Sequence, residues 1–214
     1  MPNGQASRFG ECLLFARTFL RHPLMLGSVI PSSRFLVRRI LDRIDWQGVR
    51  LAVEYGPGIG NITAEILRRL RPDAKLIVIE TNTEFVRFLR NSYADTRLQV
   101  VQGSAADVGS ILRELGHSKA SCIISGIPLS TIPATTREHI LRESHAALEP
   151  GGSFVVYQFS AGVFADLRRV FGKVERAFEP LNILPAHLFV CRLTLAETGR
   201  APEPRASVAH ARNL

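Results

Sequence analysis

The chemistry in this chain starts from three glycines that alternate in the run LAVEYGPGIGN, residues 51–61: Gly56, Gly58 and Gly60. A short apolar strand comes first and carries the acidic Glu54 near its end, and a helical pattern begins at Asn61. Glycines in such a turn let the backbone pass close to a ligand at the start of a helix. The pattern therefore predicts a binding turn for a nucleotide-type cofactor. The alternative is a glycine-rich turn that binds nothing.

The spacing of the glycines narrows the class of cofactor. It is G-x-G-x-G, whereas the dinucleotide motif is G-x-G-x-x-G, and Asn61 occupies the place of the third dinucleotide glycine. Pro57 also stiffens the turn. Nicotinamide and flavin cofactors are disfavoured, and S-adenosylmethionine is the expected cofactor.

Two further strand ends complete the expected cofactor site. Glu80 closes the next strand, where a carboxylate can accept hydrogen bonds from both ribose hydroxyls; the alternative is an exposed strand-end carboxylate. The third strand ends in a backbone amide and a small hydroxyl that can face an adenine edge, although Ser104 can equally cap a helix. The expected cofactor residues beyond the glycines, Glu54 and Asn61 are Tyr55, Glu80, Thr81, Gly103, Ser104, Ala105, Ser125 and Ser33.

The segment after the fourth strand predicts a site for a methyl acceptor. SGIPLS, Ser125–Ser130, is too apolar for an ordinary solvated loop and can enclose a dry pocket. Methyl transfer needs positioning and exclusion of water, and Ser125 with the carbonyls of Gly126 and Ile127 can aim an amine at the methyl group. Leu129 stands where an aromatic side chain would stack on a flipped base, so an aliphatic amine fits better than adenine. The alternative is a loop that only packs beneath a helix.

Apolar strands alternate with amphipathic helices along the chain, which predicts a parallel sheet covered on both faces, with ligands at the carboxyl ends of its strands. The expected fold is a Rossmann-like, doubly wound, mostly parallel α/β sheet of seven strands. After the first strand, the predicted strands are Lys75–Glu80, Arg97–Val101, Ala120–Ser125, Ser153–Phe159, Lys173–Phe178 and His187–Leu195. Beside the helix that follows the glycines, the predicted helices are Arg34–Ile44, Thr83–Tyr93, Ala105–Leu115, Ala134–Leu148 and Val163–Phe171.

Size and charge limit the classes of protein. A chain of 214 residues with 46% hydrophobic residues is long enough for one α/β domain. The net charge of +8 favours an anionic partner, either nucleic acid or an acidic membrane surface. The three cysteines are far apart, which indicates core residues in a reducing compartment and no metal site. No apolar run reaches the length of a spanning helix, so a cytoplasmic protein is expected.

Taken together, these motifs resemble the bacterial phospholipid N-methyltransferases, peripheral enzymes related in fold to the ribosomal RNA adenine dimethylases. The resemblance covers residues 15–192 and rests on Leu20–Ile40, Val53–Thr63, Glu80, Val100–Ala105, Ser125–Pro133 and Leu181–Arg192. It implies a class I methyltransferase fold, S-adenosylmethionine as cofactor, and the amine of phosphatidylethanolamine or its mono- and dimethyl forms as acceptor. Gln158 departs from the family at a strand end that is usually richer in threonine and tyrosine.

If the substrate is a lipid, the amino terminus can hold the protein at the inner face of the cytoplasmic membrane. A broad apolar face between Phe9 and Leu20 is flanked by arginines, as in an in-plane interfacial helix; the alternative is a helix packed on its own domain. Residues 1–48 are expected to bind membrane and cover the cofactor pocket, 49–196 to form the methyltransferase domain, and 197–214 to be a disordered tail. In that first segment Ser33 is expected over the cofactor, or as a helix cap.

A base for the lipid ammonium is not evident from the pattern. His187 and Tyr157 are the candidates, and for each the alternative is a structural core residue. Three other functions remain open: an RNA adenine N6-methyltransferase, an ornithine-lipid N-methyltransferase, and a non-catalytic lipid-binding module. The expected partners are an anionic membrane surface and the lipid substrate, without nucleic acid or metal.

Overall fold

A computed structural model describes residues 33–181 and 185–194 of the chain. The predicted amino-terminal amphipathic helix and the carboxyl-terminal tail lie outside the described residues. Within them, no helix is long and apolar enough to cross a membrane.

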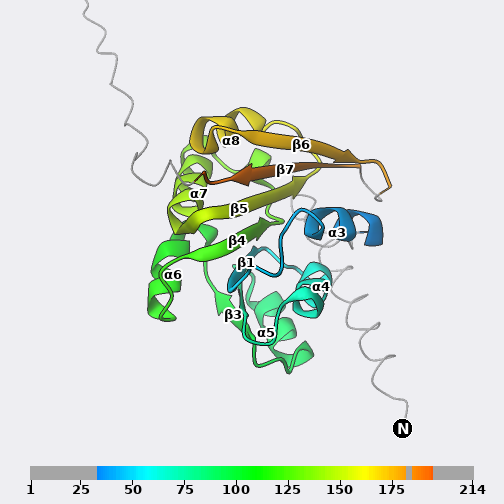
Figure 1. The fold of residues 1–214 in the computed structure, drawn as a ribbon, viewed down its shortest axis with the longest axis vertical. Coiled ribbons are helices and arrows are strands. Elements are labelled where there is room, and N and C mark those ends of the chain that lie inside the picture. Colours follow the sequence, from blue (N-terminus) through cyan, green and yellow to red (C-terminus); the bar gives the residue numbers. More distant parts are fainter. Residues whose placement is uncertain (1–32, 182–184, 195–214) are drawn as a thin grey trace, which may run out of the picture.

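The described chain forms one seven-stranded sheet, in the order β3-β2-β1-β4-β5-β7-β6 (Figure 1). Neighbouring strands are parallel from β3 to β5, whereas β7 runs antiparallel to both β5 and β6. This is the mostly parallel, doubly wound class I methyltransferase sheet that the sequence predicts. The strands are β1 (Leu51–Tyr55), β2 (Lys75–Glu80), β3 (Leu98–Gln102), β4 (Ala120–Ser125), β5 (Leu148–Gln158), β6 (Val174–Glu179) and β7 (Ala186–Arg192).

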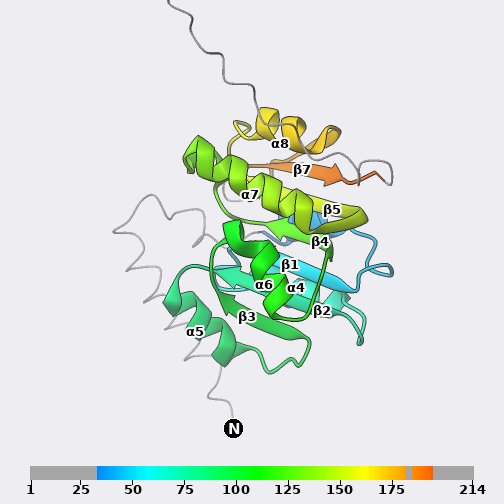
Figure 2. The same ribbon diagram turned by 90° about the vertical axis from the view of Figure 1, so that its left-hand side faces the viewer.

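Helices cover both faces of the sheet (Figures 1 and 2). Because successive side chains of a strand point to opposite faces, the central strands contribute to two separate apolar cores. One core packs against α3 (Arg34–Leu41), α4 (Asn61–Arg69) and α5 (Thr83–Ser92). The other packs against α6 (Val108–Glu114), α7 (Ala134–Ala147) and α8 (Phe164–Phe171).

Most predicted elements agree with the structure to within three residues at each end, and two differ in kind or in extent. The helix expected at Ala105–Leu115 is a short 3-10 turn, η2 (Ala105–Asp107), followed by α6. The Pro150-Gly151-Gly152 stretch, expected to separate a helix from a strand, is part of β5 instead. The backbone of Gly151 and Gly152 pairs with Leu193, so tertiary pairing overrides the local preference of these residues for a turn.

Candidate active site

The predicted cofactor turn lies at the carboxyl edge of β1 and has the backbone that its glycines permit. Gly56, Gly58 and Gly60 have φ of 62°, 57° and 82°, in the left-handed region that side chains disfavour. A Cβ on Gly56 would lie 2.7 Å from Ile127 Cγ2. A Cβ on Gly60 would lie equally close to the hydroxyl of Tyr93, which donates a 2.7 Å hydrogen bond to Gly60 O. The turn is therefore packed from two sides, and Gly56 brings it into contact with the predicted acceptor loop.

Glu54 is buried beside this turn with one oxygen unused. Its side chain is 1% exposed, and Oε2 accepts a 2.6 Å hydrogen bond from Thr63 Oγ1 at the start of α4. Oε1 has no hydrogen-bond partner among the described residues. Burial, with a smaller contribution from Glu80, raises the pKa of Glu54 to about 8. A cationic ligand in contact with Oε1 would instead favour the ionised carboxylate.

Glu80 ends β2 on the other side of the turn. Its Oε1 accepts a hydrogen bond from Asn82 N at 2.9 Å, which ties the carboxylate to the start of α5. Burial raises the pKa of Glu80, and hydrogen bonds from the backbone of Asn82, Gly58 and Thr81 oppose that shift in part. The structure thus brings together the glycine turn and both predicted carboxylates.

The hydroxyls of Ser104 and Ser33 both cap helices. Ser104 Oγ accepts from Ala106 N at 3.1 Å and begins η2. Gly103 N–H donates to Glu80 O and is not available to an adenine ring. Ser33 Oγ accepts from Leu36 N to cap α3 and donates to Leu181 O at 2.7 Å. For both serines the capping alternative is confirmed, and a role in cofactor binding stays a prediction.

The predicted acceptor loop begins at the end of β4, next to the cofactor turn. Ser125 is fully buried, and its Oγ has no partner among the described residues. Gly126 N–H donates to Tyr55 O, and a Cβ on Gly126 would lie 2.2 Å from the Tyr157 hydroxyl. The loop therefore passes between the end of β1 and the ring of Tyr157. Ile127 O accepts a hydrogen bond from Leu129 N at 2.8 Å, which uses one of its two lone pairs.

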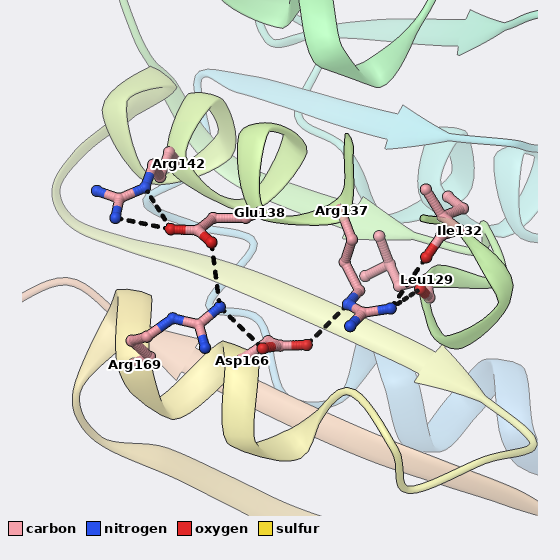
Figure 3. A network of polar contacts seen from close by, with 7 residues as sticks. All are labelled: Leu129, Ile132, Arg137, Glu138, Arg142, Asp166 and Arg169. Carbon is pink, nitrogen blue, oxygen red and sulfur yellow. Dashed lines mark hydrogen bonds and ion pairs between the residues drawn. The ribbon is translucent and has the colours of Figure 1, made fainter. Parts of the chain in front are cut away.

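Arg137, on the first turn of α7, holds the far end of this loop (Figure 3). Its Nη1 donates to Ile132 O at 2.9 Å and to Leu129 O at 3.4 Å, and its Nε donates to Asp166 Oδ2 at 2.7 Å. Arg169 links Asp166 to Glu138, which also pairs with Arg142. This charged network fixes two loop carbonyls to α7 and α8. Leu129 is fully buried beneath it, so the loop does pack against the helices.

His187 lies on β7 opposite Gln158 of β5. Its Nδ1 is 3.2 Å from Arg176 Nη2, and since a guanidinium only donates, Nδ1 is the acceptor and the neutral ring carries its proton on Nε2. Burial and the charge of Arg176 lower the pKa of His187. Because Arg176 occupies Nδ1, this arrangement does not favour the predicted role of His187 as a base. Tyr157 lies closer to the loop.

Comparison with known proteins identifies the family. Residues 52–152 match the family described as a methyltransferase domain. An ornithine lipid N-methyltransferase of Singulisphaera acidiphila is 34% identical over 184 residues, which cover 85% of this chain and 96% of the relative. The chain belongs to the class I S-adenosylmethionine-dependent methyltransferases.

Two other similar proteins agree with this assignment. The ribosomal RNA small subunit methyltransferase A of Mycoplasma mycoides is 30% identical over 104 residues, 48% of this chain and 38% of that protein. The N-methyltransferase NodS of Bradyrhizobium japonicum, solved with S-adenosyl-L-homocysteine, aligns with a TM-score of 0.57 at 14% identity, over 73% of this chain and 83% of that chain. The structural likeness supports the fold, and the sequence matches support the family.

The residues of this methyltransferase fit its cofactor. The glycine turn has the left-handed backbone that brings main-chain atoms close to a ligand, and Glu54 Oε1 is a buried acceptor without a partner among the described residues, suited to the ammonium of a methionine moiety. Glu80 stands at the strand end expected to contact the ribose. Residues 33–181 and 185–194 contain no group of three or more side chains that could hold a metal ion.

Two features of this methyltransferase were missed by sequence reasoning. The first is the contact of Arg137 with the loop carbonyls. The one signal for it in the sequence is the position of an arginine in the first turn of the helix that follows an apolar loop. The second is a cavity of about 470 Å³ beside the cofactor turn, between α3 and α4, lined by Arg34, Val37, Arg38, Asn61, Glu65, Arg68 and Arg69. The cavity brings Arg34 and Arg38 of α3 together with Arg68 and Arg69 of α4.

Proposed function

We propose that this protein is a lipid N-methyltransferase that transfers methyl groups from S-adenosylmethionine to the amine of an ornithine lipid. The observation that carries the proposal is the 34% identity to an ornithine lipid N-methyltransferase over 96% of that relative. This relation favours ornithine lipid, an alternative in the sequence analysis, over phosphatidylethanolamine, its main expectation. Phosphatidylethanolamine remains the second candidate because the residues quoted above resemble the phospholipid N-methyltransferases.

The arrangement of residues suits transfer to an amine. S-adenosylmethionine supplies a methyl group on a positively charged sulfur. When bound, the sulfonium would supply its methyl group to the deprotonated amine and would leave as a neutral thioether, so the bond formed at nitrogen balances the carbon–sulfur bond broken. In this proposal Ser125 Oγ and the Gly126 carbonyl orient the amine, and the apolar loop excludes water. The Tyr157 hydroxyl, next to Gly126, is the candidate to relay the proton.

A lipid substrate also requires a face that approaches the membrane. The exposed large apolar side chains among the described residues are Phe35, Phe159, Phe178 and Leu181. Phe159 follows the last residue of β5, Phe178 contacts His187, and Ser33 connects α3 to Leu181, so all four lie at the edge of the sheet that holds the site. An apolar edge beside basic residues supports association with an anionic bilayer.

The test is to incubate the purified protein with methyl-labelled S-adenosylmethionine and three separate acceptors: vesicles with ornithine lipid, vesicles with phosphatidylethanolamine, and total RNA. Label in ornithine lipid is the expected result. Label only in phosphatidylethanolamine would promote the second candidate, and label in RNA would overturn the lipid proposal. A Gly56→Val variant serves as the control without a cofactor site, because its side chain would meet Ile127.

A further inference from the structure

Three buried side-chain oxygens in the described part of the chain have no hydrogen-bond partner, and all three lie near the carboxyl ends of their strands. They are Glu54 Oε1, Ser125 Oγ and Gln158 Oε1. Each belongs to the last or next-to-last residue of its strand, and these strands, β1, β4 and β5, are consecutive in the sheet. Buried polar atoms in proteins nearly always have a partner, so each of these oxygens is a candidate to accept a hydrogen bond from a ligand.

The side chain of Glu54 lies on one face of the sheet, and the side chains of Ser125 and Gln158 lie on the other. Glu54 contacts Thr63 of α4, on the face where the cofactor turn begins. The side chains of Ile124 and Tyr157 belong to the core beneath α3 and α4. Ser125 and Gln158 are the next residues along the same strands, so their side chains point to the opposite face. Ser125 and Gln158 therefore lie on the face covered by α7 and α8.

The strand register makes Ser125 and Gln158 neighbours on that face. Ser125 pairs with Val156 across β4 and β5, and Gln158 lies two residues further along β5. Diagonal positions of this kind are within reach of a long side chain. His187 lies directly across from Gln158 on β7, so the pair is bordered by the acceptor loop on one side and by His187 on the other.

The orientation of the Gln158 amide is set by the backbone. Its Nε2 donates to Ser160 O at 2.6 Å, which leaves Oε1 as the atom without a partner. The residue is 6% exposed, so water offers little compensation. A buried acceptor oxygen without a partner is stabilised by a ligand that donates a hydrogen bond to it.

We propose that Gln158 Oε1 and Ser125 Oγ together accept the N–H groups of the methyl acceptor, and that Gln158 thereby limits how many methyl groups are added. This inference rests on the proposed function. A neutral primary amine offers two N–H groups, a monomethyl amine one, and a dimethyl amine none. Only the primary amine can donate a hydrogen bond to both oxygens. Binding of the acceptor therefore weakens with each methyl group that is added.

The experiment compares kcat/KM for the primary-amine lipid and for its dimethyl form. Gln158→Met keeps the length of the side chain and removes the oxygen. It is expected to lower kcat/KM for the primary amine by roughly tenfold to a hundredfold and to change that for the dimethyl form by less than about threefold. The control is Gln99→Met, the same replacement at an exposed position of β3.

Cofactor binding and thermal unfolding of each variant separate a loss of fold from a loss of recognition. Ser125→Ala removes the second oxygen without adding bulk and is expected to show the same dependence on the methylation state, so it decides the matter if Gln158→Met does not fold. An equal effect on both lipid forms, or none on either, would overturn the inference. Failure of the wild-type protein to methylate any amino lipid would instead refute the proposed function.

Discussion

At the scale of single residues, we expect Glu54 to make cofactor binding depend on pH. Its pKa of about 8 means that the free protein holds a neutral acid at pH 7, and a cationic ligand must displace that proton. Between pH 6 and 7.5 we expect the affinity for S-adenosylmethionine to rise with pH and binding to release up to one proton. Calorimetry in buffers of different ionisation enthalpy measures both quantities. Glu54→Gln should abolish the proton release.

The raised pKa of Glu54 also affects the stability of the protein without ligand. Cofactor affinity is expected to rise with pH, whereas the free energy of unfolding is expected to fall. The folded state holds the Glu54 proton up to about pH 8, whereas the unfolded chain loses it near pH 4.5, so the free energy of unfolding falls as pH rises through this window. Thr63 lowers the pKa through its hydrogen bond, so Thr63→Val should move the pH dependence of binding upward. If Glu54→Gln kept the wild-type pH profile, another group would be responsible.

At the scale of elements, Arg137 joins a loop to two helices, and its removal tests whether that loop serves the acceptor. Arg137→Lys keeps the charge but has a single ammonium in place of the fork that reaches Asp166 and two carbonyls. Because both partners are less than one-fifth exposed, we expect a loss of about 1–3 kcal/mol in the free energy of unfolding. Steady-state kinetics should show a KM for lipid raised about tenfold, with cofactor affinity unchanged.

Arg142→Lys is the matched control for Arg137→Lys. Arg142 lies on the same helix and pairs with Glu138 of the same network, and in the network of Figure 3 it does not contact the loop carbonyls. An equal rise of KM in both variants would indicate a general loss of α7 stability. A rise limited to Arg137→Lys would support a role in positioning the acceptor.

The sequence predicted those elements whose information is local. Continuous apolar runs identified the strands, and the alternating glycines identified the cofactor turn, because both depend on neighbouring residues. The role of Arg137 was missed because its partner Asp166 is far along the chain. The start of β5 was missed because Gly151 and Gly152 join the strand through backbone hydrogen bonds to the distant Leu193. The unpartnered oxygen of Gln158 becomes visible only when strand register places it beside Ser125.

At the scale of the whole molecule, the carboxyl edge of the sheet combines the predicted cofactor turn, the predicted acceptor loop and the exposed apolar side chains. A lipid head group stays within a short distance of the bilayer surface, so an enzyme that works on it must direct its site toward that surface. Leu181 is 62% exposed and Phe35 is 45% exposed at this edge. Basic residues of α3 stand next to them and can attract anionic lipids.

We therefore expect Leu181→Glu to weaken binding to anionic vesicles by about tenfold, because it removes apolar contact and adds a repelled charge. Vesicle sedimentation at low and high salt measures this effect, and cofactor affinity should not change. Ser118→Glu introduces the same charge at an exposed position before β4, at the opposite edge of the sheet, and should bind as the wild type does. Equal binding by the wild type, Leu181→Glu and Ser118→Glu would show that this edge does not face the bilayer. If position 181 contacted the bilayer, a carboxylate there would weaken binding.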